Sequence, residues 1–168
     1  MAAKKNKPEI QPPPCLHCGD PARKVAGRVI YPNRPDLYRL IFWKCDPCQA
    51  YVGSHKRSGK PKGYPGNEEV RNARKHVHKV FDPIWQNADQ DPAYAGSEKT
   101  KEAKQVIRFA ARSRAYAWLA HQMGISKETC HIAMLGIEEC RMAWPLCRKA
   151  NYSEIRAWYK ENKAILKK

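Results

Sequence analysis

Two cysteine pairs, each with two residues between the cysteines, constrain the fold of this chain more than any other feature. Cys15-Leu-His-Cys18 is followed by Gly19, a residue that easily takes positive φ, and Cys45-Asp-Pro-Cys48 comes later. This spacing lets both thiolates of a pair face one ion while backbone N–H groups of the turn bond to sulfur. Four protein ligands complete a tetrahedron and leave no position for water. The pattern predicts one structural Zn²⁺ held by Cys15, Cys18, Cys45 and Cys48.

Other uses of the cysteines and histidines are open at this point. His17 lies inside the first pair and could replace a thiolate as a ligand. A thioredoxin-like redox role is disfavoured, because that motif belongs to a βαβ context that this sequence lacks. A second metal site is a further alternative, although its spacing fits no ligand pattern. It would draw on Cys130, Cys140, Cys147, His121 and His131.

Short segments rich in β-formers lie around the second cysteine pair. They occupy residues 28–31, 40–43 and 50–52. The 26 residues between Cys18 and Cys45 are enough for a hairpin that brings the two pairs together. The sequence therefore predicts a small antiparallel zinc ribbon of about three strands.

Helical periodicity dominates the rest of the chain. Asn67 and two acids favour a helix start, and apolar residues follow at helical spacing until Asp82-Pro83 closes the helix. Residues 86–97 read as a polar linker in which Ser97 caps the next helix. That helix extends from Glu98 to about Met123, with a break near Ser113. Two more helices are expected, one at 137–149 with an interruption at Pro145 and one at 153–166. The fold class is therefore α+β, with the ribbon packed against a mainly helical part.

A helix-turn-helix is one interpretation of the segment around Gly124. Ala120 would permit close helix packing, Gly124 would turn the chain, and Cys130 would be an apolar position of the second helix. That helix would begin at residue 126 and bring Lys127 and His131 to base edges. An ordinary helical corner is the alternative.

The expected organisation has four parts. They are a basic Pro-rich arm at 1–14, the zinc ribbon and a basic loop at 15–66, a helix and polar linker at 67–97, and a helical domain at 98–168.

A net charge of +16 makes a polyanion the default partner. The excess is concentrated in residues 15–66, with ten Lys and Arg against three Asp, and in residues 98–168, with fifteen basic against seven acidic residues. One cluster is the flexible loop after His55, and others are stripes one helical turn apart. The predicted nucleic-acid contacts are Lys56, Arg57, Lys60, Lys62, Arg71, Lys75, Lys79, Lys104, Arg108, Arg112, Lys127 and His131. Tyr51, Tyr64 and Trp43 are candidate stacking residues, although Trp43 is more typical of a core.

Several pieces, in order, carry a family resemblance. They include Cys15-Leu-His-Cys18-Gly19, the segment from Phe42 through Cys45-Asp-Pro-Cys48 to His55, His78-Lys-Val-Phe-Asp-Pro-Ile-Trp85, and Arg114-Ala-Tyr-Ala-Trp-Leu-Ala120. Over roughly residues 14–145 the chain resembles a zinc-finger-containing family of unknown function found mainly in bacteriophages and prophages. The resemblance implies zinc and a phage or prophage origin, but no established activity. The loop after His55 is more basic than the family pattern, and residues 88–111 look like an insertion.

The leading functional hypothesis is a zinc-ribbon protein that binds DNA or RNA, a small phage regulator. A second is an adaptor that binds a host machine, RNA polymerase or the ribosome, through protein contacts. A third is a metal-dependent nuclease that would use His55, His78, Asp82 and His131 with Arg34 as a phosphate clamp, but no recognised catalytic spacing supports it, so we expect no enzyme. The sequence has neither a long apolar run nor an export signal. We therefore expect no membrane contact and a location in the cytoplasm, that of the bacterial host if the protein is phage-encoded.

Overall fold

A computed structural model describes residues 9–96, 99–164 and 166. The chain divides into two compact units, Met1–Glu68 and Glu69–Lys168. Each unit has its own core and is described by itself.

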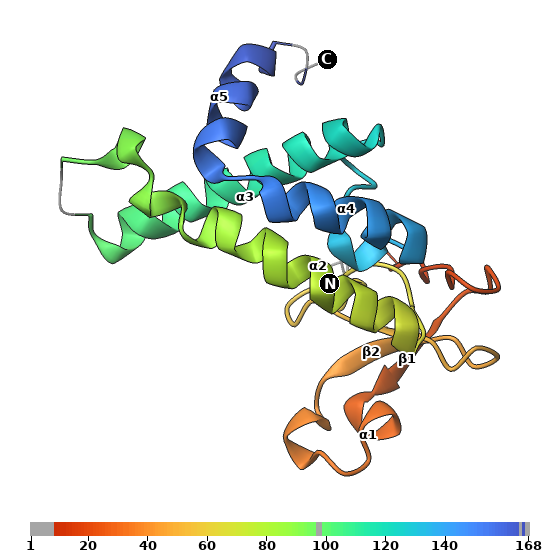
Figure 1. Cartoon of the computed structure of the whole chain (residues 1–168). Coiled ribbons are helices and arrows are strands. Elements are labelled where there is room, and N and C mark those ends of the chain that lie inside the picture. The colour runs from red at the N-terminus through yellow and green to blue at the C-terminus, as the bar shows by residue number, and fades with distance from the viewer. Residues whose placement is uncertain (1–8, 97–98, 165, 167–168) are drawn as a thin grey trace, which may run out of the picture. The chain divides into compact units, whose positions relative to one another are not determined.

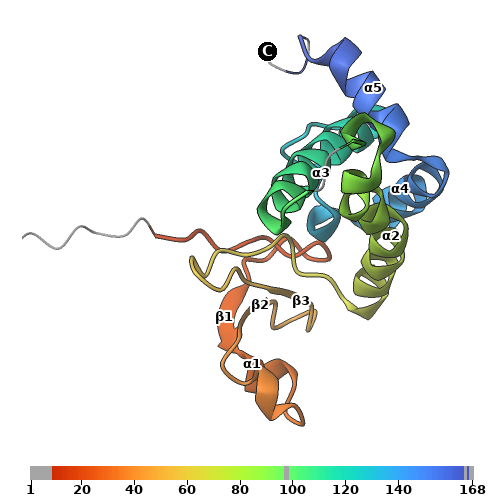
Figure 2. The same ribbon diagram turned by 90° about the vertical axis from the view of Figure 1, so that its left-hand side faces the viewer.

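The first unit contains a three-stranded antiparallel sheet (Figure 2). Its strands are β1 (Arg23–Ala26), β2 (Ile41–Lys44) and β3 (Tyr51–Gly53), in the order β1-β2-β3. The register pairs Lys24 with Trp43 and Trp43 with Val52. The three-stranded antiparallel ribbon predicted from the sequence is therefore confirmed.

The first strand lies earlier in the chain than the sequence predicts. Residues 28–31 do not form a strand: Gly27–Ile30 is a short helix, α1, and a 3-10 helix follows at Pro35–Leu37. Gly27 is buried, and a Cβ there would lie 1.8 Å from the carbonyl oxygen of Leu37. The β-branched residues of this segment favour a strand. The chain must fold back tightly here to reach β2, and this requirement outweighs their β-propensity.

A small apolar cluster supports the sheet. Trp43, Ala22 and Val52 are buried together, and Ile10 packs against them. The backbone N–H of Ala22 also donates to the carbonyl of Pro13, 3.0 Å away. The end of the predicted arm is therefore attached to the ribbon, because Ile10 has apolar surface to bury. Lys4, Lys5 and Lys7 of that arm lie outside the described residues.

The second unit is helical (Figure 1). Its α-helices are α2 (Glu68–Gln86), α3 (Lys101–Met123), α4 (Ile137–Lys149) and α5 (Tyr152–Asn162), and its 3-10 helices are Ala88–Gln90, Pro92–Tyr94 and Ile132–Met134. Helix α3 contacts both α4 and α5. Its Ala111 and Ala115 are fully buried, and such small side chains allow the helices to approach closely.

Two predicted helix boundaries are wrong. Pro83 lies inside α2, which continues to Gln86. Phe81 and Ile84 are buried on either side of the proline, and their packing outweighs the lost backbone donor. Helix α3 has no break at Ser113 and begins after Thr100, whose hydroxyl accepts from the N–H of Ala103. The predicted cap Ser97 lies outside the described residues.

The helix-turn-helix prediction is also wrong. Gly124 does end α3, with φ +65°, and the N–H of Ile125 bonds back to the carbonyl of Ala120, as in a Schellman motif. The chain then makes a turn in which the N–H of Cys130 donates to the carbonyl of Ser126. Only the three-residue 3-10 helix Ile132–Met134 follows, so no second α-helix stands where a recognition helix would lie.

Candidate zinc centre and cationic surfaces

The four predicted cysteine ligands come together in the first unit. One ligand atom from each of Cys15, Cys18, Cys45 and Cys48 lies within 4.8 Å of all the others. The Sγ atoms of Cys18 and Cys45 are 3.5 Å apart. A zinc–sulfur distance of about 2.3 Å gives an edge of about 3.8 Å in a tetrahedron of thiolates, so this cluster has the right size for one zinc ion.

Backbone geometry prepares each cysteine pair for metal binding. In the first turn Gly19 has φ +78°, and its N–H donates to the carbonyl of Cys15. In the second turn Gln49 takes the equivalent place with φ +54°, and its side chain donates to the carbonyl of Asp46. A non-glycine residue is strained in this region of φ, and the side-chain bond offsets part of that cost.

His17 supports the site through its backbone. Its N–H donates to the Sγ of Cys15 over 3.4 Å, which is the bond expected of a zinc-knuckle turn. The imidazole is not part of the ligand cluster. The four-thiolate ligand set therefore stands without histidine.

The electrostatics of the cluster also fit a cation. A hydrogen bond with Cys18 and then desolvation raise the pKa of Cys48 to about 12. Thiolates this close repel one another, so all four ionise together only when a divalent cation compensates their charge. Soft sulfur ligands in a closed set of four select zinc rather than magnesium or calcium. When bound, zinc would fix the two turns to each other and supply no open position for catalysis.

The loop after His55 is an ordered hairpin rather than a flexible loop. The N–H of His55 donates to the carbonyl of Lys60, and the N–H of Gly59 donates back to His55. We call residues 54–62 the cationic hairpin. Four of its side chains are exposed, and among the residues that the structure describes no carboxylate forms an ion pair with them. They are Lys56, Arg57, Lys60 and Lys62.

A cleft lies beside the cationic hairpin. It has a volume of about 390 Å³ and is lined by hairpin residues together with Arg39 and the Leu40–Phe42 stretch. Of the candidate stacking residues in this unit, Trp43 is only 2% exposed and belongs to the core. The ring of Tyr51 packs edge-on against Tyr31 and Phe42, with a hydroxyl contact to Tyr31 of 2.8 Å.

The predicted cations of α2 lie in different surroundings. Lys75 and Lys79 are exposed, and the Nζ of Lys75 bonds to Asn72. Arg71 is half-buried. Arg74 is not among the core residues expected from the sequence, yet it is buried and its Nε donates to the carbonyl of Leu135. Burial lowers the pKa of Arg74 to about 10, so the side chain stays cationic at neutral pH.

The predicted stripe on α3 is brought together with an aromatic ring from α2. Lys104, Arg108 and Arg112 line a cavity of about 440 Å³ with Trp85 and Phe109. Arg108 has an acidic partner, because its Nε donates to Asp89 over 2.8 Å. Trp85 and Phe109 are not among the site residues predicted from the sequence. The signal that could have found Phe109 is its place among the cations of α3 instead of on the apolar face.

Lys127 and His131 do not lie on a recognition helix that could contact base edges. Lys127 is exposed in the turn after α3. The ring of His131 stacks on Tyr116, with centroids 5.0 Å apart, and its Nδ1 accepts from the N–H of Ala133. His131 therefore supports the turn into the 3-10 helix Ile132–Met134.

Of the residues proposed for a nuclease, two form a pair. The Nδ1 of His78 lies 3.1 Å from Asp82, which also accepts the indole N–H of Trp85. Arg34 is paired with Asp36 in the first unit. His131 is engaged by Tyr116 as described above. No group of three or more potential metal ligands was found among the described residues besides the four cysteines.

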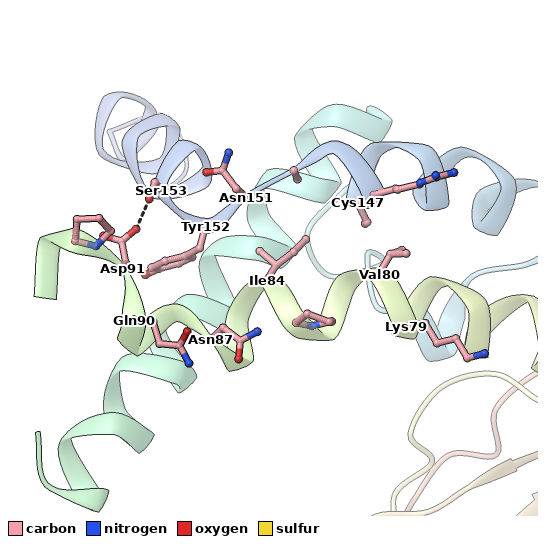
Figure 3. Close-up of a pocket in the computed structure, with 14 residues that line it drawn as sticks. Lys79, Val80, Ile84, Asn87, Gln90, Asp91, Cys147, Asn151, Tyr152 and Ser153 are labelled. Carbon is pink, nitrogen blue, oxygen red and sulfur yellow. Dashed lines mark hydrogen bonds between the residues drawn. The ribbon is translucent and has the colours of Figure 1, made fainter. Parts of the chain in front are cut away.

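A larger hollow in the helical unit is lined by α2, α4 and α5 (Figure 3). Its volume is about 510 Å³. The hydroxyl of Ser153 donates to Asp91 across one end, and the side chains of Asn87 and Gln90 lie along the other wall. The carboxylate of Asp91 also accepts from the N–H of Ala93, so these polar groups hold the connection between the helices together.

None of the helices in the described part of the chain combines the length and apolar character that a membrane span needs.

Comparison with known proteins agrees with the metal centre. No curated protein and no solved structure matches the chain. Residues 11–150 match a family described as a zinc-finger-containing domain, and this match covers most of the sequence and includes all four cysteine ligands. The chain therefore belongs to this family of zinc-finger-containing domains, designated DUF3268.

Proposed function

We propose that this zinc protein binds nucleic acid, and that the cationic hairpin is its main phosphate contact. The observation that carries the proposal is the fixed presentation of Lys56, Arg57, Lys60 and Lys62 without carboxylate partners in the described chain. Four like charges on one short hairpin repel one another. A polyanion relieves that repulsion and releases its own counterions on binding.

The hairpin is well suited to this role because the ribbon holds it in place. The indole N–H of Trp43 donates to the carbonyl of Gly59, and the N–H of Lys62 donates to the carbonyl of Gly53 in β3. A preformed surface loses little conformational entropy when it binds. The zinc ion would act as a structural element of the ribbon.

The biological setting that we propose is that of a small phage-encoded regulator. Its polymer, DNA or RNA, is to be identified by experiment. The alternative is an adaptor that uses the same charges to bind an acidic protein surface of RNA polymerase or the ribosome. The two proposals differ in how binding responds to salt and to nuclease.

The first test is a salt series of fluorescence anisotropy with the full zinc-loaded chain. The probes are a labelled duplex DNA, a labelled single-stranded DNA and a labelled structured RNA. We expect the logarithm of the binding constant to fall linearly with the logarithm of salt, with a slope of about 0.9 per phosphate contact on duplex DNA and about 0.7 on single strands. Changing the four hairpin cations to Gln should lower that slope by about 3 and weaken binding at least tenfold.

A matched control removes the same charge elsewhere. Arg141, Lys149, Lys160 and Lys163 are exposed cations of the helical unit outside the predicted contacts. Changing these four to Gln should leave most of the slope in place. If both quadruple variants lose the same affinity, binding depends on the overall charge of the chain. The assignment of the phosphate contact to the hairpin is then wrong.

The same protein separates the alternatives. A flat salt response on all three probes contradicts nucleic-acid binding, and host proteins retained on the immobilised chain after nuclease treatment then identify the adaptor. Cleavage of any probe during incubation with Mg²⁺ or Mn²⁺ identifies a nuclease. Intact probes support a binding protein.

A further inference from the structure

The first half of α3 and the end of α2 together form a groove whose composition is unusual. It is lined by four cations, one glutamine and two aromatic rings. Its residues are Trp85, Lys101, Lys104, Gln105, Arg108, Phe109 and Arg112. We call it the aromatic–cationic groove. Its α3 members recur at helical spacing along one side of the helix, so a single extended ligand could touch all of them.

Phe109 is the feature that needs an explanation. Phe109 is 77% exposed, although α3 has a buried face that begins at Ala111 and continues to Met123. A ring this exposed buries little apolar surface, so it contributes little to the stability of this unit. Beside cations it offers a flat apolar surface next to positive charge, which is what a nucleotide requires.

Trp85 comes from α2 and is held in a defined orientation where it lines the groove. Its indole N–H donates to Asp82 over 3.2 Å. The guanidinium of Arg112 lies 5.5 Å from the centroid of the Trp85 ring and also 5.5 Å from that of Tyr116. The aromatic wall is therefore preorganised by a hydrogen bond and a cation–π contact.

The cations of the groove divide into two kinds. Arg108 is held by Asp89, which is itself only 7% exposed, and Arg112 is held between two rings. Lys101 and Lys104 are exposed, and no ion pair to a carboxylate of the described chain involves either of them. Neither lysine would have to break an ion pair to reach a phosphate group.

Two other occupants fit less well. A second copy of the chain on this groove would bring the same cations against each other. Duplex DNA would satisfy the lysines but not the rings, because its base faces are already stacked. An unpaired base has free faces, and its flanking phosphates match the lysines.

We propose that the aromatic–cationic groove binds single-stranded nucleic acid, with an unpaired base stacked on Phe109 beside Trp85 and the flanking phosphates on Lys101 and Lys104. This inference rests on the proposed function and names the class of polymer that it prefers. It assigns to the helical unit a binding role separate from that of the cationic hairpin.

The test compares a labelled oligo-dT strand of 20 nucleotides with a labelled 20-base-pair duplex on the full zinc-loaded chain. Phe109→Ala should weaken binding of the single strand about tenfold, as expected for the loss of one stacked base, and should leave duplex binding unchanged. It should not alter the salt slope, because no charge is removed. Lys101→Gln with Lys104→Gln should lower the single-strand slope by about 1.4.

Val106→Ala is the matched control. Val106 is also an exposed apolar residue of α3, at 70%, but it does not line the groove. This variant should bind both probes as the unmodified chain does. Circular dichroism of the exposed-site variants should match that of the unmodified chain, since neither residue is in the core.

The outcomes distinguish this inference from the proposed function. If the chain binds both probes with equal affinity and Phe109→Ala changes neither affinity, the groove assignment is wrong. The hairpin assignment is tested separately by the hairpin variants. An equal loss on both probes also overturns it. A dimer that Phe109→Ala dissociates in sedimentation would make the groove a self-interface. Absence of binding to every probe removes both proposals.

Discussion

The indole N–H of Trp43 donates to the carbonyl of Gly59 over 3.1 Å and so ties the core of the ribbon to the cationic hairpin. Trp43 is 2% exposed, and the cation of Lys24 lies 4.9 Å from the centroid of its ring. The hairpin is therefore an extension of the ribbon core. Removing the indole donor should loosen the hairpin before it unfolds the sheet.

Trp43→Phe tests this relationship. We expect the free energy of unfolding to fall by about 1–3 kcal/mol, because the Gly59 carbonyl loses its partner and a smaller ring fills the site. Amide hydrogen exchange at His55 and Gly59 should accelerate. Tyr38→Phe, which also removes one side-chain donor to a backbone carbonyl, should leave exchange in the hairpin unchanged.

Metal removal should act on one unit and not the other. The chain should hold one zinc ion by elemental analysis, and Cys45→Ser should abolish stoichiometric binding. Zinc binding contributes directly to folding of such sites, so chelation should expose Trp43. The summed emission of the five tryptophans should then shift to longer wavelength. The helical circular dichroism of the second unit should persist. Loss of all helical signal on chelation would contradict the division into two units.

Thiol labelling independently counts the cysteines that become accessible when zinc is removed. Burial raises the pKa of Cys130 and of Cys140 to about 11 and that of Cys147 to about 12, so all three are neutral thiols at pH 8. Zinc removal should open the ribbon and expose the four ligand cysteines, whereas these three stay buried in the folded helical unit. An alkylating reagent should therefore add to the four and spare the three. Mass spectrometry should find four adducts, and seven only after denaturation. Additional early adducts would mean that the helical core opens easily.

Gly27→Ala should be among the most damaging small substitutions in the ribbon. The new Cβ would lie 1.8 Å from the Leu37 carbonyl oxygen, so the backbone must shift. We expect a loss of about 3 kcal/mol or more in unfolding free energy. Gly53→Ala in β3 is the control, because its nearest neighbour would be a flexible lysine side-chain atom at 3.8 Å. A thermal melt that shows equal losses would contradict the close approach at Gly27.

The ion pair of Asp89 with Arg108 predicts an acid-sensitive fold. Its hydrogen bond with Arg108 holds the pKa of Asp89 below the ordinary value, about 3.9 when unfolded. A carboxyl with a lowered folded pKa contributes stability that is fully present above the unfolded pKa and is lost as pH falls through the folded pKa. Melting temperature should therefore drop below about pH 4. In Asp89→Asn this part of the drop should be absent.

Local chemistry was enough to predict the metal site. The Cys-x-x-Cys spacing and Gly19 act within single turns, so the sequence alone predicts which four residues bind zinc. The helix predicted at 137–149 is also confirmed, although the predicted interruption at Pro145 is wrong, because Pro145 lies inside α4. Each of these features depends on residues a few positions apart.

Long-range packing decided the rest. The burial of Phe81 and Ile84 carries α2 through Pro83, and the tight turn at Gly27 overrides the β-propensity of the residues after it. The segment after Gly124 has a plausible helix-turn-helix pattern, but contacts such as His131 on Tyr116 hold it in turns. Trp85 and Phe109 line one groove only because α2 and the start of α3, joined by two 3-10 helices, lie beside each other. No local pattern encodes that approach, since it depends on the free energy of packing side chains from two different helices.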